Sequence, residues 1–202
     1  MSAITSDAEP GLRERKKAAT RQALHEAAVR LLMEHGPEKL TVEAIADEAG
    51  VSRRTFSNYF ANKDEALFHG EVTRMRQLAA MLRSRPAEEA PWAALCAAAE
   101  DFCRQVGELD PEWFARSRMI RAHPSLLAAQ IQTFAAMERE LSAEVAARLG
   151  PSETSPVRAR LMSATFLVVL RVSLTIWLEH PADVHYWDLA RESLAEAGRG
   201  FA

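Results

Sequence analysis

The stretch from Thr41 to Lys63 reads TVEAIADEAGVSRRTFSNYFANK, and it predicts two short helices joined at a glycine. Thr41 suits the N-cap of the first helix, since its hydroxyl can accept a hydrogen bond from an unpaired backbone N–H. Gly50 follows that helix and favours the left-handed conformation in which many helices end. Between the two, apolar residues recur at helical spacing at Val42, Ile45, Ala46 and Ala49.

The second helix of this stretch carries polar residues on its outer face. Gly50 and Val51 form the turn before it, Ser52 can cap it, and Phe56 and Phe60 face inward because they are four residues apart. In a DNA major groove, arginine can pair with guanine and asparagine with adenine, while hydroxyls can reach base edges or phosphates. The alternative is a small helical corner that binds nothing. We predict base contacts from Arg53, Arg54, Thr55 and Asn58.

Phosphate contacts are expected from residues around these two helices. Asn62 and Glu65 have the spacing of a capping box, so a further helix begins near Lys63. Backbone donors at a helix start, together with a lysine, suit a DNA phosphate. The residues assigned to phosphates are Thr41, Ser52, Ser57, Tyr59, Lys63, Lys16 and Lys17.

Charge is distributed unevenly along the 202 residues. The formal net charge of −3 argues against a protein that binds nucleic acid over its whole surface. All four lysines, however, lie at or before Lys63, and residues 11–21 hold five basic residues against one acidic residue. Residues 64–202 carry 15 arginines against 19 acidic residues. Attraction to phosphates is therefore expected from the N-terminal part of the chain.

The N-terminal part resembles the DNA-binding domain of TetR-family transcriptional regulators. A basic amphipathic helix precedes the quoted stretch, and the resemblance extends from Arg21 to Lys63. Ser57 departs from the pattern, because the family most often has an aromatic residue there. The resemblance implies a three-helix head with a larger helical body. It is carried by Arg21, Ala27, Ala28, Gly36, Thr41, Val42, Ile45, Ala46, Ala49, Gly50, Val51, Ser52, Thr55, Tyr59, Phe60 and Lys63.

The whole chain is predicted to be all-α, with about nine helices. Residues 1–10 are expected to be a disordered arm, residues 11–62 the helix-turn-helix head, and residues 63–202 the body that binds a ligand and dimerises. Helix boundaries are expected at Gly36-Pro37, Asp110-Pro111, Pro124, Gly150-Pro151, Ser155-Pro156 and His180-Pro181, with Asp183 capping the last helix. No segment alternates like a strand.

The sequence lacks the motifs of several common enzyme classes. The sequence has no Walker loop, no Gly-x-Gly-x-x-Gly, no Gly-x-Ser-x-Gly, and no Glu-x-x-His pair for a di-iron bundle. Cys96 and Cys103 are seven residues apart on one expected helix, or about 10 Å, which is too far for an intrachain disulfide. We expect no enzyme, no catalytic residue, no cofactor and no metal site.

The eighth expected helix is apolar on more than one face, which is typical of a helix buried on both sides. Helix-turn-helix proteins commonly pair two heads, so we expect a homodimer through the last two helices, as the resemblance also implies. The alternative is a core helix of a monomer. Arg171 near the middle of the apolar run would cost about 3 kcal/mol in a membrane, so we interpret the run as a buried helix. Met1 to Pro10 is short and polar and does not resemble a secretory signal, so we expect a cytoplasmic protein. The predicted interface comprises Leu161, Val168, Val172, Ile176, Trp187 and Leu194.

A small-molecule site is expected in the body. Its apolar wall is predicted from Phe102, Phe134, Met137, Phe166 and Trp177, with Arg121 or Arg171 meeting an acidic end. The alternative is that the arginines of the body, including Arg116 and Arg118, pair with acids such as Glu112 or Glu138. Residues 116–126 also resemble, more weakly, actinobacterial TetR members that sense acyl-CoA-like molecules.

The leading hypothesis is a dimeric repressor that binds a palindromic operator in double-stranded DNA and is released by a small apolar effector, which in the first of these alternatives has an acidic end. A non-releasing or activating regulator of the same fold is the alternative. A helical-bundle enzyme is the alternative from another class.

Overall fold

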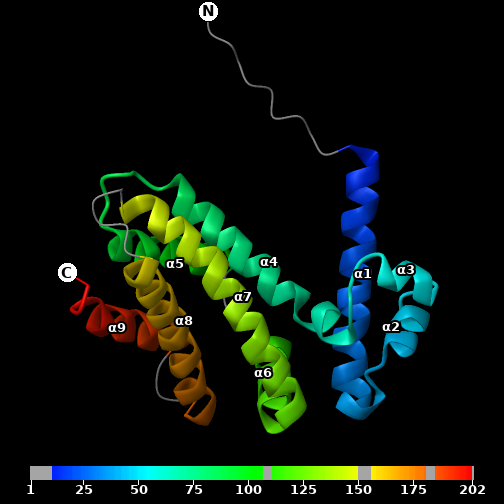
Figure 1. Cartoon of the computed structure of the whole chain (residues 1–202). Helices are drawn as coiled ribbons and strands as arrows, with labels where there is room; N and C mark the ends of the chain where they lie inside the picture. Colours follow the sequence, from blue (N-terminus) through cyan, green and yellow to red (C-terminus); the bar gives the residue numbers. More distant parts are fainter. Residues whose placement is uncertain (1–10, 107–110, 150–155, 181–184, 202) are drawn as a thin grey trace, which may run out of the picture. The chain divides into compact units, whose positions relative to one another are not determined.

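The computed structural model describes residues 11–106, 111–149, 156–180 and 185–201, and within these ranges it contains helices and no strands (Figure 1). The all-α prediction is confirmed for these residues. The elements are α1 (Leu12–His35), the 3-10 helix η1 (Pro37–Lys39), α2 (Val42–Glu48), α3 (Arg53–Ser57), α4 (Lys63–Ser84), α5 (Pro91–Val106), α6 (Pro111–Ala122), α7 (Pro124–Leu149), α8 (Pro156–Glu179) and α9 (Tyr186–Gly198).

The chain forms two compact units, one ending at His69 and the other beginning at Gly70. We call residues 11–69 the head and residues 70–201 the body. The division falls within α4, seven residues after that helix begins at Lys63. The expected arm at residues 1–10 lies outside the described residues.

The head is built around one face of α1, which packs on η1 and α2, while α2 packs on α3. The start of α4 joins this core through His25, whose Nδ1 lies 2.9 Å from the carbonyl oxygen of Ala66. Because a carbonyl can only accept, this nitrogen carries the proton. The buried apolar residues of the head include Leu24, Ala27, Ala28, Leu32, Leu40, Ile45, Ala46, Phe56, Phe60, Leu67 and Phe68.

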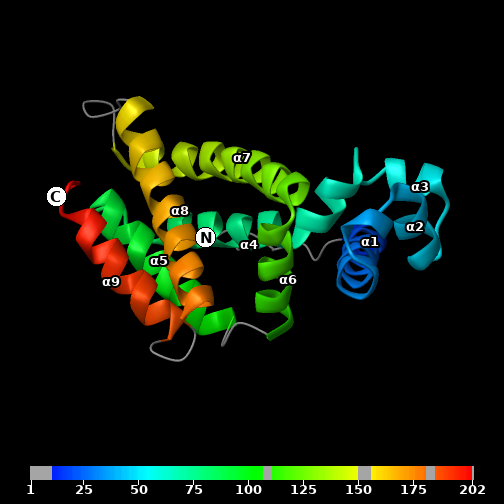
Figure 2. The same ribbon diagram turned by 90° about the horizontal axis from the view of Figure 1, so that it is seen from below.

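The body packs α8 between α7 and α9, and α5 contacts both α7 and α9 (Figures 1 and 2). Trp92 of α5 is central to this packing. Its Nε1 donates to the carbonyl oxygen of Leu194 at 3.2 Å, and its ring stacks on Phe201 with centroids 4.8 Å apart. The buried core includes Leu78, Leu82, Leu95, Met137, Leu141, Val145, Met162, Phe166, Leu167 and Leu194.

Proline begins four helices of the body, α5 through α8, at Pro91, Pro111, Pro124 and Pro156. The first helical position tolerates proline because the missing N–H would have no intrahelical partner there. Helix α9 begins at Tyr186 after His185, which makes no side-chain capping bond. The expected boundary residues Asp110, Gly150, Pro151, Ser155, Pro181 and Asp183 lie outside the described residues.

Helix α8 is long and apolar enough to cross a membrane by length and composition, with a mean hydropathy of 1.9 over its best window. Core helices of soluble proteins meet the same criteria, and α8 packs on α7 and α9. Its hydropathy alone therefore does not place this helix in a membrane.

Candidate DNA-binding site

The turn between α2 and α3 is made by Gly50, whose φ is +67°. The N–H of Gly50 donates to the carbonyl oxygen of Asp47 at 3.0 Å, and that of Val51 donates to Ala46 at 2.9 Å. The left-handed backbone of Gly50 therefore ends α2 and redirects the chain into α3. The predicted left-handed turn is confirmed.

Both predicted N-caps are present. The hydroxyl oxygen of Thr41 accepts from the N–H of Ala44 at 3.1 Å, and that of Ser52 accepts from the N–H of Thr55 at 3.1 Å. The hydroxyl of Ser52 also lies 2.9 Å from that of Thr55. Each capping hydroxyl has a hydrogen as well as its lone pairs, so accepting the cap bond leaves it able to donate to a phosphate oxygen.

Helix α3 buries one aromatic face and exposes its polar residues. Phe56 is 1% exposed and packs on Phe60, with ring centroids 5.9 Å apart. Arg53 and Asn58 are exposed, and Arg53 Nη1 forms an ion pair with Glu43 Oε1 at 3.1 Å. The exposed predicted residues are Ser52, Arg53, Arg54, Ser57 and Asn58, whereas Thr55 and Tyr59 are half-buried. These side chains thus form a polar surface beside the turn.

The start of α4 has the predicted capping box. Asn62 Oδ1 accepts from the N–H of Glu65 at 2.9 Å, and Glu65 Oε2 accepts from the N–H of Ala61 at 2.8 Å. Lys63 is the first residue of the helix and is half-buried. The partial positive charge of a helix N-terminus adds to that of the lysine ammonium, which favours an anion at this end.

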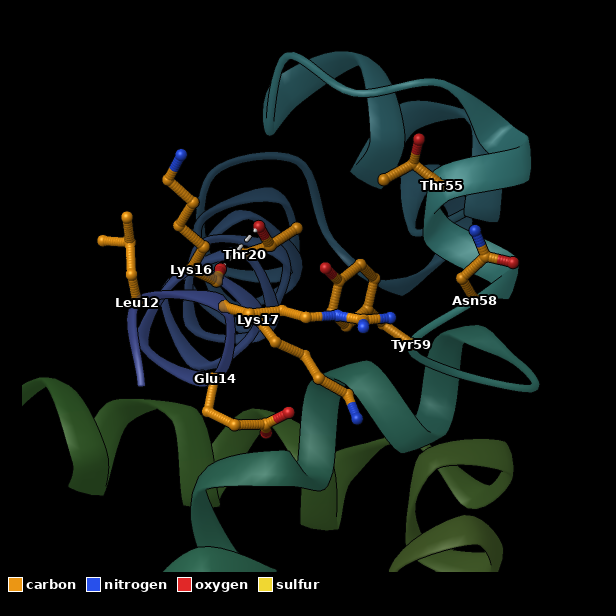
Figure 3. Close-up of a pocket in the computed structure, with 9 residues that line it drawn as sticks. Leu12, Glu14, Lys16, Lys17, Thr20, Thr55, Asn58 and Tyr59 are labelled. Atoms are coloured by element: carbon orange, nitrogen blue, oxygen red, sulfur yellow. Dashed lines mark hydrogen bonds between the residues drawn. The ribbon is translucent and has the colours of Figure 1, made fainter. Parts of the chain in front are cut away.

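A groove of about 740 Å³ separates the first turns of α1 from α3 (Figure 3). Lys16 and Lys17 line it from α1, and Thr55 and Asn58 line it from α3. Tyr59 lies between Lys17 and Asn58 in the same view. A groove with lysines on one wall and hydrogen-bonding groups on the other suits a sugar-phosphate backbone. Leu12, Glu14 and Thr20, which the sequence prediction missed, complete the lining with Arg13, a member of the basic stretch 11–21.

Two family comparisons agree with this geometry. Residues 24–69 match the family described as bacterial regulatory proteins, tetR family, and residues 89–202 match the MftR C-terminal domain. The HTH-type transcriptional regulator TcmR of Streptomyces glaucescens is 34% identical over 197 residues, covering 94% of this chain and 87% of TcmR. The chain belongs to the TetR family. It is therefore a DNA-binding transcriptional regulator, and not an enzyme.

Solved structures show that the TetR fold extends over most of the chain. FadR of Thermus thermophilus, a TetR-family repressor in complex with lauroyl-CoA, has a TM-score of 0.55 at 19% identity, covering 87% of this chain and 91% of FadR. The SmeT–triclosan complex has a TM-score of 0.55 at 20% identity, covering 90% of this chain and 91% of that one.

In this TetR-family chain the residues predicted to bind a ligand fall in different places. Phe134 and Arg171 line a surface groove of about 430 Å³ between α7 and α8. Trp177 packs on Phe114 of α6, with ring centroids 4.1 Å apart, and Arg121 Nη1 donates to Thr175 Oγ1 at 2.5 Å. Met137 and Phe166 are buried in the core, against which the half-buried Phe102 also packs. Four of the predicted residues, Phe102, Phe134, Met137 and Phe166, thus lie in or against one core cluster, to which Arg121, Arg171 and Trp177 do not belong.

Glu138, one of the acids expected to pair with the arginines named in the prediction, binds a different arginine. Glu138 forms an ion pair with Arg160, at 3.1 Å between its Oε1 and the arginine Nε. Arg118 and Arg171 are exposed, and Arg121 bonds to a threonine hydroxyl. Sequence analysis missed Arg74, which lies half-buried on α4 near Glu71 and Arg116. The signal was available, because Glu71 and Arg74 stand three apart on the same helix face.

Of the predicted dimer interface, the four residues on α8 are exposed and the two on α9 are not. Leu161, Val168, Val172 and Ile176 are 41–55% exposed. Leu194 is 1% exposed and belongs to the core of its own subunit, and Trp187 is half-buried against that core. The reason is that the apolar stripe of α9 is already covered by α5 and α8.

Proposed function

We propose that this TetR-family regulator is a homodimeric repressor that binds a palindromic operator through α3 and is released by a small apolar effector. The observation that carries the DNA-binding part is the exposed polar face of α3, held by the Gly50 turn beside the lysine-lined groove. Arg53, Arg54, Thr55 and Asn58 are the proposed base contacts. The cytoplasm, where bacterial operator DNA lies, is the proposed location.

The dimer surface is proposed to lie on α7 and α8. Seven large apolar side chains on these helices are exposed, each by 37–63%. Exposed apolar surface of this extent, on neighbouring helices, is typical of an interaction face. The exposed residues of α9 include Arg191, Glu192 and Glu196, so α9 offers a charged surface instead. The proposed apolar face consists of Leu127, Ile131, Val157, Leu161, Val168, Val172 and Ile176.

A second copy of the chain is the proposed occupant of this face. A single head reads half of a palindrome, and paired helix-turn-helix heads read half-sites about one helical turn apart. The surface groove lined by Phe134 and Arg171 lies on the same face, because Leu127, Ile131 and Val168 line it as well. We therefore assign this groove to the subunit interface, and we place the effector elsewhere in the body.

Two charge insertions test the interface. Val168→Glu puts a carboxylate on the apolar face of α8, whereas Ala195→Glu puts one on the exposed face of α9. Sedimentation velocity should show a dimer for the wild type and for Ala195→Glu, and a monomer or a much weaker dimer for Val168→Glu. A dimer that Val168→Glu leaves intact while Ala195→Glu breaks it would place the interface on α9 instead.

Release by an effector is proposed from the two-part fold and from what the solved relatives bind. The FadR structure holds lauroyl-CoA and the SmeT structure holds triclosan, both of which have large apolar parts. The proposed test is a mobility shift with the DNA upstream of the chain's own gene, followed by addition of lauroyl-CoA or triclosan. Binding without release by either compound favours the alternative, an activating or non-releasing regulator.

A further inference from the structure

Arg74 is a half-buried cation of the body, and one nitrogen of its guanidinium group is buried without a hydrogen-bond partner among the described residues. Its Nη2 is inaccessible to solvent, and no acceptor among these residues lies within hydrogen-bonding distance of it. Buried polar groups in folded proteins nearly always have partners, and a guanidinium is the most costly of them to leave unsatisfied. The position therefore needs an explanation other than packing.

The charged groups that act on Arg74 include one acid and one further arginine. Glu71 lies one turn earlier on α4 and attracts it, whereas the guanidinium of Arg116 on α6 repels it. Glu71 is itself shared, since it is attracted by Arg116 more strongly than by Arg74, and Gln130 Nε2 of α7 donates to Glu71 Oε2 at 3.5 Å. The Glu71 carboxylate thus interacts with guanidinium groups from both α4 and α6. Helices α4, α6 and α7 lie side by side in this part of the body (Figure 2).

The pKa directions agree with this arrangement. Burial lowers the pKa of Arg74, only partly offset by the Glu71 carboxylate, and the charge of Arg116 lowers it further. Burial also raises the pKa of Glu71, opposed by Arg116, Arg74 and the bond from Gln130. Burial therefore makes the ionised forms of Arg74 and Glu71 less favourable in free energy. A negative group bound beside Arg74 would stabilise its charged form.

We propose that Arg74, together with Arg116, forms an oxyanion-binding subsite that receives the carboxylate or phosphate end of the effector. Guanidinium groups suit this role because their planar N–H groups match the oxygens of a carboxylate or a phosphate. This inference deepens the proposed effector response and rests on it. It moves the acidic contact from Arg121 and Arg171 to α4, because Arg171 is exposed and Arg121 donates to Thr175.

Glu71 has a defined part in this proposal. Its carboxylate is the resident anion of the cluster, so an effector oxyanion competes with it for the two guanidinium groups. Replacing Glu71 by glutamine removes the competing charge and keeps the shape. We therefore expect E71Q to bind small oxyanions about tenfold more tightly than the wild type. If the cluster served only packing, the same variant would lose a partner of both arginines and gain no affinity.

The test is a titration with sodium sulfate or sodium acetate against sodium chloride at constant ionic strength, read as the shift in Tm of the full chain. The background is K16A/K17A, which removes the lysines of the groove in the head. At about ten times Kd, a bound anion should raise Tm by about 3–6 °C in a saturable manner. A stronger response to sulfate indicates a phosphate end, and a stronger response to acetate indicates a carboxylate end.

The variants are compared by this anion-induced shift, so a general loss of stability does not hide the result. R74Q should lose the shift, R74K should keep part of it, and E71Q should reach saturation at about tenfold lower concentration. The matched control is R76Q, two residues away on α4, where the arginine side chain is 60% exposed. The subsite proposal is wrong if the parent protein shows no anion-induced shift in Tm, or if R74Q shows the same shift as the parent. It is also wrong if R76Q loses the shift as completely as R74Q does, or if E71Q binds the anion no more tightly than the parent.

Failure of the proposed function would look different. For this comparison R74Q is made in the protein that retains Lys16 and Lys17. Its affinity for the DNA upstream of the gene should equal that of the wild type, because the subsite lies in the body and α3 lies in the head. If neither protein binds this DNA, the repressor proposal fails, whereas the anion titration still decides the subsite.

Discussion

Arg21 of α1 donates a hydrogen bond from Nη2 to the backbone carbonyl oxygen of Tyr59, at 3.2 Å. Its guanidinium also lies over two aromatic rings, 5.9 Å from the centroid of Tyr59 and 5.6 Å from that of Phe60. The arginine thus joins the first helix to the residues that follow α3. Tyr59 in turn lines the groove proposed for the DNA backbone.

Replacing Arg21 should affect both stability and DNA binding. Arg21→Ala removes the bond and both ring contacts, and we expect a loss of about 1–3 kcal/mol in the free energy of unfolding. DNA affinity should fall about tenfold because Tyr59 is no longer held. Arg21→Lys keeps the charge but not the planar group, and should recover only part of either loss. Chemical denaturation and fluorescence anisotropy measure the two effects.

The control for Arg21 is Arg30→Ala on the same helix. Arg30 forms an ion pair with Glu48 at 3.0 Å, and its side chain is 48% exposed. An exposed pair contributes at most about 1 kcal/mol. Equal effects of Arg21→Ala and Arg30→Ala on both readouts would contradict the role assigned to Arg21.

Gly50 should resist substitution because of its backbone alone. A Cβ at this position would meet no atom within 4 Å, so the cost comes from the φ of +67°. Gly50→Val should destabilise the head by about 1–2 kcal/mol or more and weaken DNA binding, whereas Gly50→Asn should be milder, since asparagine tolerates this region. Gly11→Val is the comparison, with φ at −58° and similarly open surroundings. Wild-type DNA binding by Gly50→Val would show that the turn does not position α3.

Gly198 should resist substitution for the opposite reason. Its backbone is helical, but a Cβ would lie 2.2 Å from Nε1 of Trp92. Gly198→Ala should therefore displace the ring, disturb its bond to Leu194, and cost about 1–3 kcal/mol. Thermal unfolding measures the loss, with Gly200→Ala as the control, where the nearest atom would be 3.7 Å away. Equal Tm values for the two variants would show that the Trp92 contact is not as close as described.

Both cysteines should react slowly with alkylating agents. Burial raises the pKa of Cys96 and Cys103 from 9.0 to about 11. At pH 8, below both values, the thiolate fraction therefore falls about 100-fold, and alkylation by iodoacetamide should slow by at least that factor relative to the unfolded chain. Stability should not depend on these thiols below pH 8 and should fall above about pH 9, where unfolded thiols ionise first. Rapid labelling of the native protein would contradict their burial.

Sequence reasoning succeeded where a local signal decides the structure. The Gly50 turn, the caps Thr41 and Ser52, and the capping box of Asn62 and Glu65 are each set by a few adjacent residues. Proline at the first position marked the helices of the body for the same reason.

Tertiary packing is where sequence reasoning failed. Helix α8 is apolar around most of its surface, so its pattern could not tell which face is left exposed. Leu194 was assigned to the dimer interface, although α5 and α8 cover it within one subunit. The close approach of Gly198 to Trp92 could not be predicted, because nothing adjacent in the sequence indicates the ring of Trp92 beside it. Burial of Arg74 likewise depends on helices that are distant in the chain.

The central claim is that α3 reads DNA sequence, and a binding-site selection tests it most directly. Randomised duplexes should be selected with wild-type protein and with Arg53→Ala, Arg54→Ala and Asn58→Ala, each at fixed salt, with Lys63→Ala as the comparison. Each α3 variant that removes a base contact should relax preference at one position in each half-site, by about 1–3 kcal/mol. Lys63→Ala should instead weaken binding to all sequences and lower the salt dependence by about one phosphate contact. If all three α3 variants select the same sequence as the wild type with unchanged discrimination, α3 is not the element that reads the operator.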